Sequence, residues 1–205
     1  MTKLVSFYSK KGGVGKTTLA VNFAYYLLSE GHSVEFIDLD PQQSAKMFFP
    51  NNHEKLHYST SLRHTLKADF SVVDYPPGAT LEHNVKGYPI LIANPTKLSI
   101  KDTYIAINND EFARYSIIIN RVQTQIRDNN AILTELVELI KRKNAEGKTV
   151  CNMLNTVALR AGLQSAENMN KSIFNLDSDE RAKVSDLKAL RENLTTIFEK
   201  IVKYC

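Results

Sequence analysis

The sequence predicts a doubly wound α/β fold, in which a mostly parallel sheet carries helices on both faces. Apolar runs of strand length alternate along the chain with segments of helical periodicity, which is typical of βαβ units. Runs such as Ser116-Ile117-Ile118-Ile119 are apolar throughout, as expected for strands that are covered on both faces. In such folds, ligands bind outside the carboxyl ends of the strands. Candidate site residues are therefore sought where predicted strands end.

The predicted elements follow from apolar runs and from three- and four-residue spacing of apolar side chains. Strands are predicted at Leu4–Tyr8, Val34–Asp38, Phe70–Asp74, Ile90–Ala93, Tyr115–Asn120 and Val150–Val157. Helices are predicted at Thr17–Ser29, Ile100–Asn108, Asn130–Lys143 and Ala182–Val202. Pro41–Lys67 is the least regular stretch and is expected to hold loops and short helices. With no repeat or long linker, residues 1–205 are predicted to form a single domain.

Composition excludes several classes of protein. Hydrophobic residues make up 43% of the chain and charged residues 23%, but no apolar run reaches the roughly 18 residues of a transmembrane helix. Strand-like sequence begins by Lys3, so no signal peptide is expected. The two cysteines, Cys151 and Cys205, are far apart and fit a reducing compartment, which predicts a cytoplasmic protein. The net charge of +4 permits a nucleic-acid partner without requiring one.

The segment Lys10–Thr18, which reads Lys-Lys-Gly-Gly-Val-Gly-Lys-Thr-Thr, joins the first predicted strand to the first predicted helix. Glycines allow backbone N–H groups to converge on phosphate oxygens, and the helix N-terminus adds a partial positive charge. The strand before and the helix after argue against a chance glycine–lysine turn. The residues predicted to bind nucleotide phosphates are Lys11, Gly12, Gly13, Val14, Gly15, Lys16, Thr17 and Thr18.

The two lysines of this loop are expected to differ in role. Lys16 is placed to reach the β- and γ-phosphates, and the Thr17 hydroxyl is placed to hold Mg²⁺. The usual phosphate loop has its first glycine where this chain has Lys10, so the loop is a lysine-first variant. Lys11 precedes the glycines and can point out of the loop. We expect it to supply a second cation to the nucleotide of a neighbouring subunit.

Two acidic segments follow predicted strands. Asp38-Leu39-Asp40-Pro41-Gln42 places carboxylates just past one strand, where they suit Mg²⁺ or an attacking water. Asp74 ends another strand and is followed by Tyr75-Pro76-Pro77-Gly78, a rigid turn. Either segment alone is more often an ordinary strand-end turn. Their order behind the glycine loop, each at a strand end, favours a common site.

Together the three segments resemble the deviant Walker A box, the switch I motif Asp-x-Asp-Pro-Gln and the Asp-x-Pro-Pro-Gly motif of the ParA/MinD family of dimeric ATPases. The resemblance implies a P-loop fold that binds ATP, ADP and Mg²⁺. It implies catalytic roles for Lys11, Lys16 and Asp40, and metal binding by Thr17, Asp40 and Asp74. The short gap between Asp40 and Asp74 resembles compact, plasmid-type partition ATPases.

The resemblance continues along the chain, with some departures. Asn120-Arg121 resembles the strand-end pair that lies near the adenine in this family, so Asn120 is predicted to bind nucleotide. Gln43 stands where the family often has glycine, and Tyr75 where threonine or serine is usual. No helix-turn-helix extension precedes the first strand, so binding to a specific operator is not expected.

By the same resemblance, the ATP-bound form is an associated pair of chains that coats nucleoid DNA without sequence preference. It would release DNA when a centromere-binding, ParB-like partner stimulates hydrolysis. Such DNA binding uses lysine and arginine contacts to phosphates. The candidates are Lys141, Arg142, Lys143, Lys148, Arg160, Lys171, Lys188 and Arg191. For any one of them, a solvated helix face is an equal alternative.

Three other functions are alternatives to DNA partition. A MinD-like or cargo-positioning ATPase would act on a membrane or a protein, but Glu192 and Glu199 favour a core role for the last helix, so membrane binding is not expected. An iron-protein-like cluster carrier would need paired cysteines. A small-molecule ligase remains open, although the lysine-first loop followed by Asp-Pro-Gln is not usual for that class.

Overall fold

A computed structural model describes residues 1–49, 53–62, 68–79, 85–123, 125–158 and 160–205. Within this part of the chain, seven parallel strands form one sheet in the order β3-β2-β4-β1-β5-β6-β7. The strands are β1 (Lys3–Tyr8), β2 (Val34–Asp38), β3 (Leu56–Ser59), β4 (Phe70–Asp74), β5 (Tyr88–Ala93), β6 (Arg114–Val122) and β7 (Val150–Ala158). The predicted fold class is confirmed.

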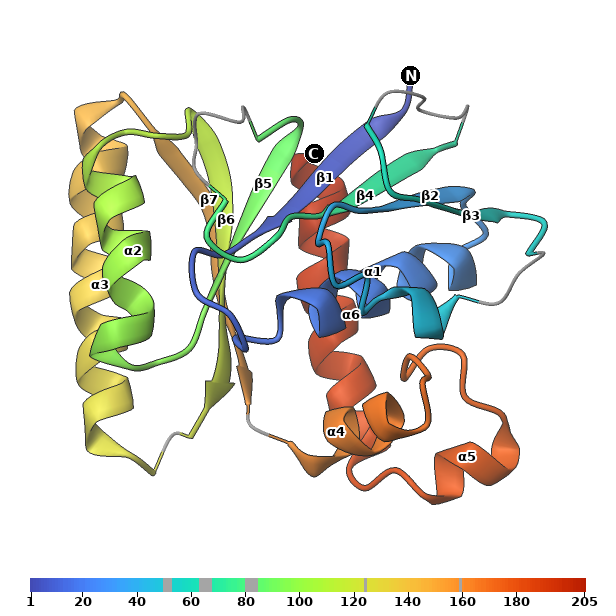
Figure 1. The fold of residues 1–205 in the computed structure, drawn as a ribbon. Helices are drawn as coiled ribbons and strands as arrows, with labels where there is room; N and C mark the ends of the chain where they lie inside the picture. Colours follow the sequence, from blue (N-terminus) through green and yellow to red (C-terminus); the bar gives the residue numbers. More distant parts are fainter. Residues whose placement is uncertain (50–52, 63–67, 80–84, 124, 159) are drawn as a thin grey trace.

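Helices cover both faces of the sheet (Figure 1). They are α1 (Lys16–Ser29), α2 (Lys97–Asn108), α3 (Arg127–Glu146), α4 (Ala161–Asn168), α5 (Ser178–Ala182) and α6 (Leu187–Tyr204), with a 3₁₀ turn η1 (Lys46–Phe48). α1 and α6 pack on one face and α2 and α3 on the other. In the part described, no helix combines the length and apolarity needed to cross a membrane.

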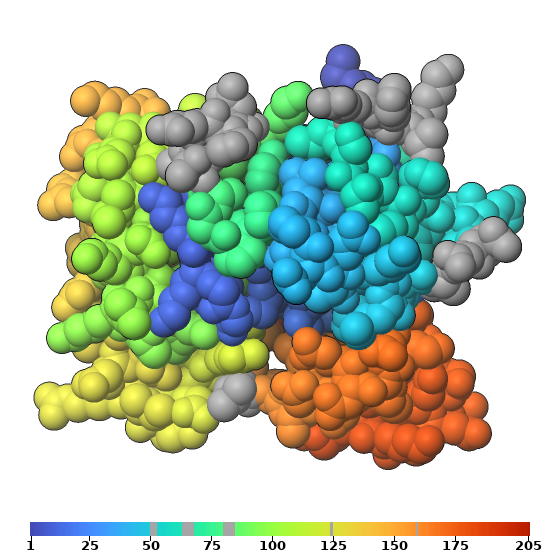
Figure 2. All heavy atoms as spheres, in the orientation of Figure 1, coloured from blue at the N-terminus to red at the C-terminus, as the bar shows by residue number. Residues whose placement is uncertain are grey.

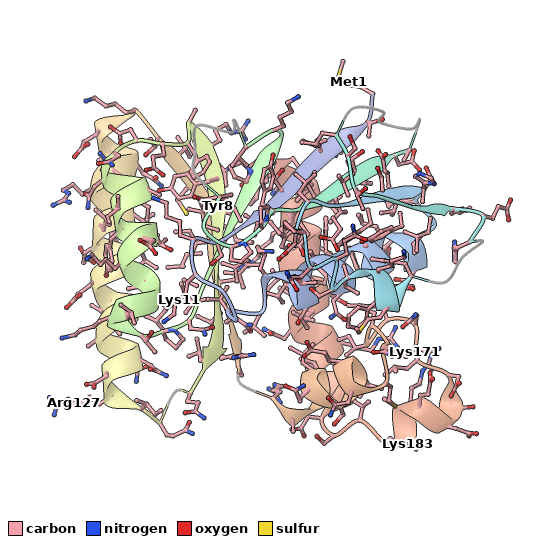
Figure 3. The ribbon with its side chains drawn as sticks, in the orientation of Figure 1. Met1, Tyr8, Lys11, Arg127, Lys171 and Lys183 are labelled. Carbon is pink, nitrogen blue, oxygen red and sulfur yellow. The ribbon has the colours of Figure 1, made fainter. Side chains whose placement is uncertain are left out.

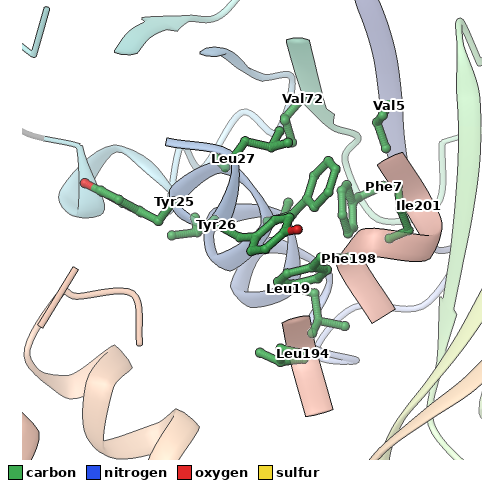
Figure 4. Close-up of a cluster of buried hydrophobic side chains, with 14 of the residues drawn as sticks. Val5, Phe7, Leu19, Tyr25, Tyr26, Leu27, Val72, Leu194, Phe198 and Ile201 are labelled. Atoms are coloured by element: carbon green, nitrogen blue, oxygen red, sulfur yellow. The ribbon is translucent and has the colours of Figure 1, made fainter. Parts of the chain in front are cut away.

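The face that carries α1 and α6 has an aromatic centre. The ring of Phe23 on α1 lies 5.7 Å from that of Phe7 and 5.2 Å from that of Phe198. Figure 4 shows Phe198 beside Phe7 and Ile201, with Val72 of β4 in the same cluster. Burying each aromatic side chain stabilises the fold by about 2–3 kcal/mol, so this cluster fixes α1, and with it the loop that precedes α1. The prediction that the last helix is a core helix is confirmed by its five buried apolar residues.

The register of the strands brings the acidic residues together at one edge. Asp38 of β2 lies opposite Asp74 of β4, and Phe7 of β1 lies opposite Asp74 on the other side. Because the strands are parallel, the segments that follow all three emerge at the same edge. The order β2-β4-β1 therefore places the segment that follows Asp74 between the Asp38 segment and the glycine loop.

Three elements differ from the sequence prediction. The edge strand β3 falls inside the stretch expected to be irregular, and part of that stretch lies outside the described residues. Helix α4 was not predicted, because its eight residues are too few to show a clear apolar period. The helix predicted at Ala182–Val202 was wrong at its start: α5 ends at Ala182 and α6 begins at Leu187, after Asp186, whose φ is +53°.

Candidate nucleotide-binding site

The glycine loop lies between β1 and α1 and lines a pocket at the carboxyl edge of the sheet. Residues 11–18 all contribute to this pocket, with Asp40, Ser44, Pro77, Arg121 and Glu167. Gly13 and Gly15 have φ values of +73° and +87°, in the left-handed region that favours glycine. Gly15 has no side chain with which to cap α1. The first N–H groups of that helix are thus left for a ligand, as in phosphate-binding loops.

Lys16 and Thr17 both contact Asp74, which ends the neighbouring strand β4. The Lys16 ammonium forms an ion pair with Asp74 Oδ1, and the Thr17 hydroxyl donates a hydrogen bond of 2.6 Å to Asp74 Oδ2. Lys16 is 6% exposed and Asp74 is fully buried. Burial raises the pKa of Asp74, while the Lys16 charge and the Thr17 hydroxyl oppose the rise. The predicted Lys16, Thr17 and Asp74 therefore meet at one point.

The oxygen donors at this point fit Mg²⁺. Mg²⁺ is usually held by one or two carboxylates together with the phosphates of the substrate, rather than by a complete protein cage. Thr17 and Asp74 provide a hydroxyl and a carboxylate side by side, and Asp40 lines the same pocket. Among the described residues, no group of three or more acidic, His or Cys side chains forms a metal cage. The donor set suits a metal that arrives with phosphate.

Asp38 ends β2 and Asp40 lies just after it, and the two carboxylates have different structural roles. Asp38 is buried; Tyr58 donates a hydrogen bond of 3.0 Å to its Oδ2, and its Oδ1 accepts one of 3.0 Å from the Asp40 N–H. Burial raises the pKa of Asp38, and the Tyr58 hydrogen bond lowers it. Within the described part of the chain, the Asp40 carboxylate accepts a hydrogen bond of 2.9 Å from the Gln42 N–H of its own turn, and it lines the pocket. Asp38 thus braces the turn that presents Asp40.

The two residues that depart from the family pattern, Gln43 and Tyr75, each have a defined conformation or contact in the structure. Gln43 has a φ of +47°, a conformation that glycine adopts without strain. Tyr75 is buried, and its hydroxyl oxygen accepts a hydrogen bond of 3.1 Å from the Lys86 N–H. Tyr75 is therefore a packing residue beneath the turn that follows Asp74.

Asn120, at the end of β6, contacts the glycine loop. Its side-chain amide donates a hydrogen bond of 2.8 Å to the carbonyl of Val14, and the side chain is 5% exposed. A Cβ placed on Gly15 would collide with that amide. Asn120 also lines a second pocket, whose other lining residues include Arg160, Leu163 and Gln164. Its predicted contact with the base stays a prediction, while its contact with the loop is a finding.

Several pocket residues were not identified in the sequence. Ser44 follows the Asp40 turn, and Glu167 comes from α4 on the far side of the loop. Pro77 belongs to the predicted turn after Asp74. Glu167 was missed because nothing in the sequence placed α4 beside α1. The two residues in contact there, Thr18 and Glu167, are 149 positions apart in the chain. In Figure 2, blue N-terminal atoms reach the surface just above the orange atoms of this region.

The predicted DNA-contacting residues fall into two patches. The α3-end patch contains Lys141, Arg142 and Lys148, which are exposed at the end of α3 and before β7. The α4–α6 patch contains Arg160, Lys171, Lys188 and Arg191, from the opposite end of the molecule, where Figure 3 labels Lys171 and Lys183. Arg160 also lines the second pocket, so this patch adjoins the candidate nucleotide site.

Not all of these cations are free. Lys143 is buried, with its ammonium 2.6 Å from Asp110 Oδ1 and 3.2 Å from Glu146 Oε2. It joins α3 to the segment after α2, and we leave it out of the proposed DNA surface. Arg191 lies over the Phe174 ring at 5.4 Å, and burial lowers its pKa. The Lys171 ammonium lies 3.4 Å from Glu180 Oε1, in a partly buried ion pair.

The fold and the site define a P-loop nucleotide-binding protein, with one lysine and one threonine beside a strand-end aspartate. The sequence pattern of the AAA_31 family, described as an AAA domain, matches residues 2–199. The chain belongs to this family, and its relatives place it among the ParA/MinD ATPases.

A relative and two solved structures illustrate the likeness. The chromosome-partitioning ATPase Soj of Thermus thermophilus is 36% identical over 91 residues, which span 44% of this chain and 32% of that protein. A protein of Borrelia burgdorferi assigned to plasmid partition, bound to AMPPNP, has a TM-score of 0.65 at 21% identity, covering 98% of this chain and 99% of that one. pNOB8 ParA bound to nonspecific DNA has a TM-score of 0.63 at 12% identity, covering 99% and 98%. The chain thus matches about a third of the length of the Soj relative, and the two structures share its fold.

Proposed function

We propose that this protein is a DNA-partition ATPase, which binds ATP with Mg²⁺, pairs with a second copy, and then binds DNA without sequence preference. Hydrolysis, stimulated by a centromere-binding adaptor of the ParB kind, would release the DNA. The observation that carries the proposal is the meeting of Lys16, Thr17 and Asp74 beneath a lysine-first glycine loop, with Asp40 across the same pocket.

The proposed reaction is in-line attack of water on the γ-phosphate. Lys16 would exchange Asp74 for phosphate oxygens and neutralise the charge that spreads over them. Asp40, which faces the pocket on a turn braced by Asp38, would orient the attacking water. Mg²⁺ held near Thr17 and Asp74 would supply further neutralisation of the phosphates. The loop and the first turn of α1 would fix the phosphates by backbone N–H groups.

Lys11 supports the proposal of a paired, ATP-bound form. Lys11 is half-buried. It lines the pocket just before the glycines, at the carboxyl ends of the strands. Lys16 already lies within the loop on its own side, so a second lysine at Lys11 is better placed for phosphates that approach from outside. In two chains facing each other across this edge, each Lys11 would meet the nucleotide of its partner. ATP would then hold the pair together through charge that ADP lacks.

The α4–α6 patch is the surface that best explains DNA binding controlled by ATP. It shares Arg160 with the second pocket and so lies close to the edge where two chains would meet. Pairing would join the patches of both chains into one surface, and affinity for DNA phosphates rises steeply with the number of contacts. The α3-end patch lies away from that edge and would be unaffected by pairing.

The relatives of this chain support a role in partition at the level of the family. A curated relative is a chromosome-partitioning ATPase, and one structure with this fold carries nonspecific DNA. If this chain acts in the same way, it is cytoplasmic and associates with the nucleoid. The positive net charge of the chain is compatible with that location.

The test is DNA retention by the full chain with ATP and Mg²⁺, with ADP and Mg²⁺, and without nucleotide, across a salt series. Of the three conditions, we expect DNA binding in the one with ATP and Mg²⁺. This binding should weaken steeply as the salt concentration rises and should not depend on the DNA sequence. Equal binding in all three conditions would contradict control by ATP. ATP hydrolysis without DNA binding at low salt would overturn the DNA proposal and favour a protein cargo instead.

A further inference from the structure

Glu167 stands where the two pockets of the site join. The phosphate pocket and the second pocket share four lining residues, which are Gly15, Thr18, Arg121 and Glu167. A nucleotide with its phosphates in the first pocket and its base in the second must place its sugar at this junction. The residues of the junction therefore face the sugar.

Of these four described residues, Glu167 is the one with a carboxylate. Gly15 has no side chain, Thr18 has a hydroxyl and Arg121 a guanidinium. Glu167 Oε1 lies 3.4 Å from Thr18 Oγ1, a long hydrogen bond that uses little of the accepting capacity of the carboxylate. The remaining capacity faces the junction. A carboxylate at the junction would repel a phosphate oxygen. It therefore needs a hydrogen-bond donor on the bound nucleotide.

The hydroxyl groups of a ribose are such donors. In dinucleotide-binding Rossmann folds, a carboxylate accepts a hydrogen bond from a ribose hydroxyl in this way. A site built to hydrogen-bond a hydroxyl also rejects an analogue without it, because the site group is then left unpaired. α4 holds Glu167 through buried Gly162 and Ala166, so its position does not depend on an exposed loop.

We propose that Glu167 is a specificity-determining residue that accepts a hydrogen bond from a ribose hydroxyl and so selects ribonucleotides over deoxyribonucleotides. This rests on the proposed function only in that the site binds a nucleotide. Neither ATP hydrolysis nor pairing of chains is required.

The experiment is calorimetric titration of the full chain with Mg²⁺ and ADP, 2′-deoxy-ADP or 3′-deoxy-ADP. ADP is chosen so that pairing driven by the γ-phosphate does not contribute. The variants are Glu167→Ala and Glu167→Gln, with Glu192→Gln as a control, since Glu192 is an exposed carboxylate on α6. Thermal unfolding of each variant shows whether α4 remains in place.

With the wild-type chain and with Glu192→Gln, we expect one or both deoxy analogues to bind about tenfold more weakly than ADP. With Glu167→Ala, all three ligands should bind with equal affinity, and Glu167→Gln should keep part of the preference, since its amide oxygen still accepts. A preference for ADP that survives in Glu167→Ala, or its absence in the wild type, would overturn the inference. A wild-type chain that binds none of the three ligands would instead overturn the proposed nucleotide site.

Discussion

The side-chain amide of Asn120 donates a hydrogen bond of 2.8 Å to the carbonyl of Val14, which joins the end of β6 to the middle of the glycine loop. Both groups are buried, so the bond has no water to replace it. It holds the loop in the conformation that its glycines permit, with Gly15 packed against the same amide. β6 thus helps to shape a loop that lies 106 residues earlier in the chain.

Changing Asn120 to Asp tests this brace. The carboxylate would accept rather than donate, and would face the Val14 carbonyl in a buried place. We expect a loss of about 2 kcal/mol in the free energy of unfolding and about tenfold weaker ADP binding. Urea unfolding and calorimetry measure the two effects. If Asn120→Asp weakened ADP binding with no loss of stability, the amide would serve the base and not the loop.

Changing Lys16 to Met should make stability depend on pH. Without Lys16, burial raises the pKa of Asp74 further above its unfolded value, which is about 4. The folded variant then binds a proton more tightly than the unfolded chain does. Its stability is highest below about pH 4 and falls as the pH rises through the raised pKa of Asp74. At neutral pH we expect the variant to be roughly 3 kcal/mol less stable than the wild type.

Urea unfolding of Lys16→Met at several pH values measures this loss. The double variant Lys16→Met/Asp74→Asn is the control, because it has no carboxylate at position 74 to leave unpaired. Its difference from the wild type should change little with pH. A deficit in Lys16→Met that stayed constant from pH 5 to pH 8 would show that the Asp74 charge is not its source.

Changing Asp40 to Ala should separate hydrolysis from binding. Asp40 lines the pocket and accepts a hydrogen bond from its own turn, while Asp38 makes the contacts that hold the segment. We expect ATP turnover to fall by about 100-fold while ATP affinity and thermal stability stay close to wild type. Phosphate release and calorimetry report these values. Wild-type turnover in Asp40→Ala would assign the water to another residue.

Removing two cations from either basic patch should affect DNA binding differently. Lys171→Ala/Lys188→Ala should weaken ATP-dependent DNA binding and reduce its salt slope by about 2. Arg142→Ala/Lys148→Ala removes the same charge from the α3-end patch and should leave both unchanged. A DNA retention series with ATP measures the slopes. The reverse pattern would place DNA on α3, and equal effects would indicate a response to net charge alone.

The positions of the site residues could be predicted from the sequence where they depend on residues that are neighbours along the chain. Lys16 and Thr17 take their places from one glycine turn, and Asp74 from one strand end. Their meeting also needs β1 and β4 to be neighbours in the sheet, which the structure supplies. The parallel sheet could be predicted because its strands are continuously apolar, as in β6.

Contacts between distant segments could not be predicted in this way. Asn120 was expected at the base, yet its amide also supports the loop, and only the contact between the end of β6 and the glycine loop reveals this. Glu167 lies on a short helix with no periodic signal. Lys143 was grouped with exposed lysines because its neighbours in sequence are exposed, whereas its partner Asp110 comes from a different segment.

The central claim is that ATP joins two copies of this chain through Lys11. The most direct measurement is the mass in solution of Asp40→Ala, which we expect to retain ATP, by light scattering with ATP or ADP and Mg²⁺. We predict twice the 23.2 kDa chain mass with ATP and 23.2 kDa with ADP. Adding Lys11→Ala should restore 23.2 kDa with ATP bound, while Lys10→Ala should not. A single-chain mass for Asp40→Ala saturated with ATP, or a pair that survives Lys11→Ala, would contradict the claim.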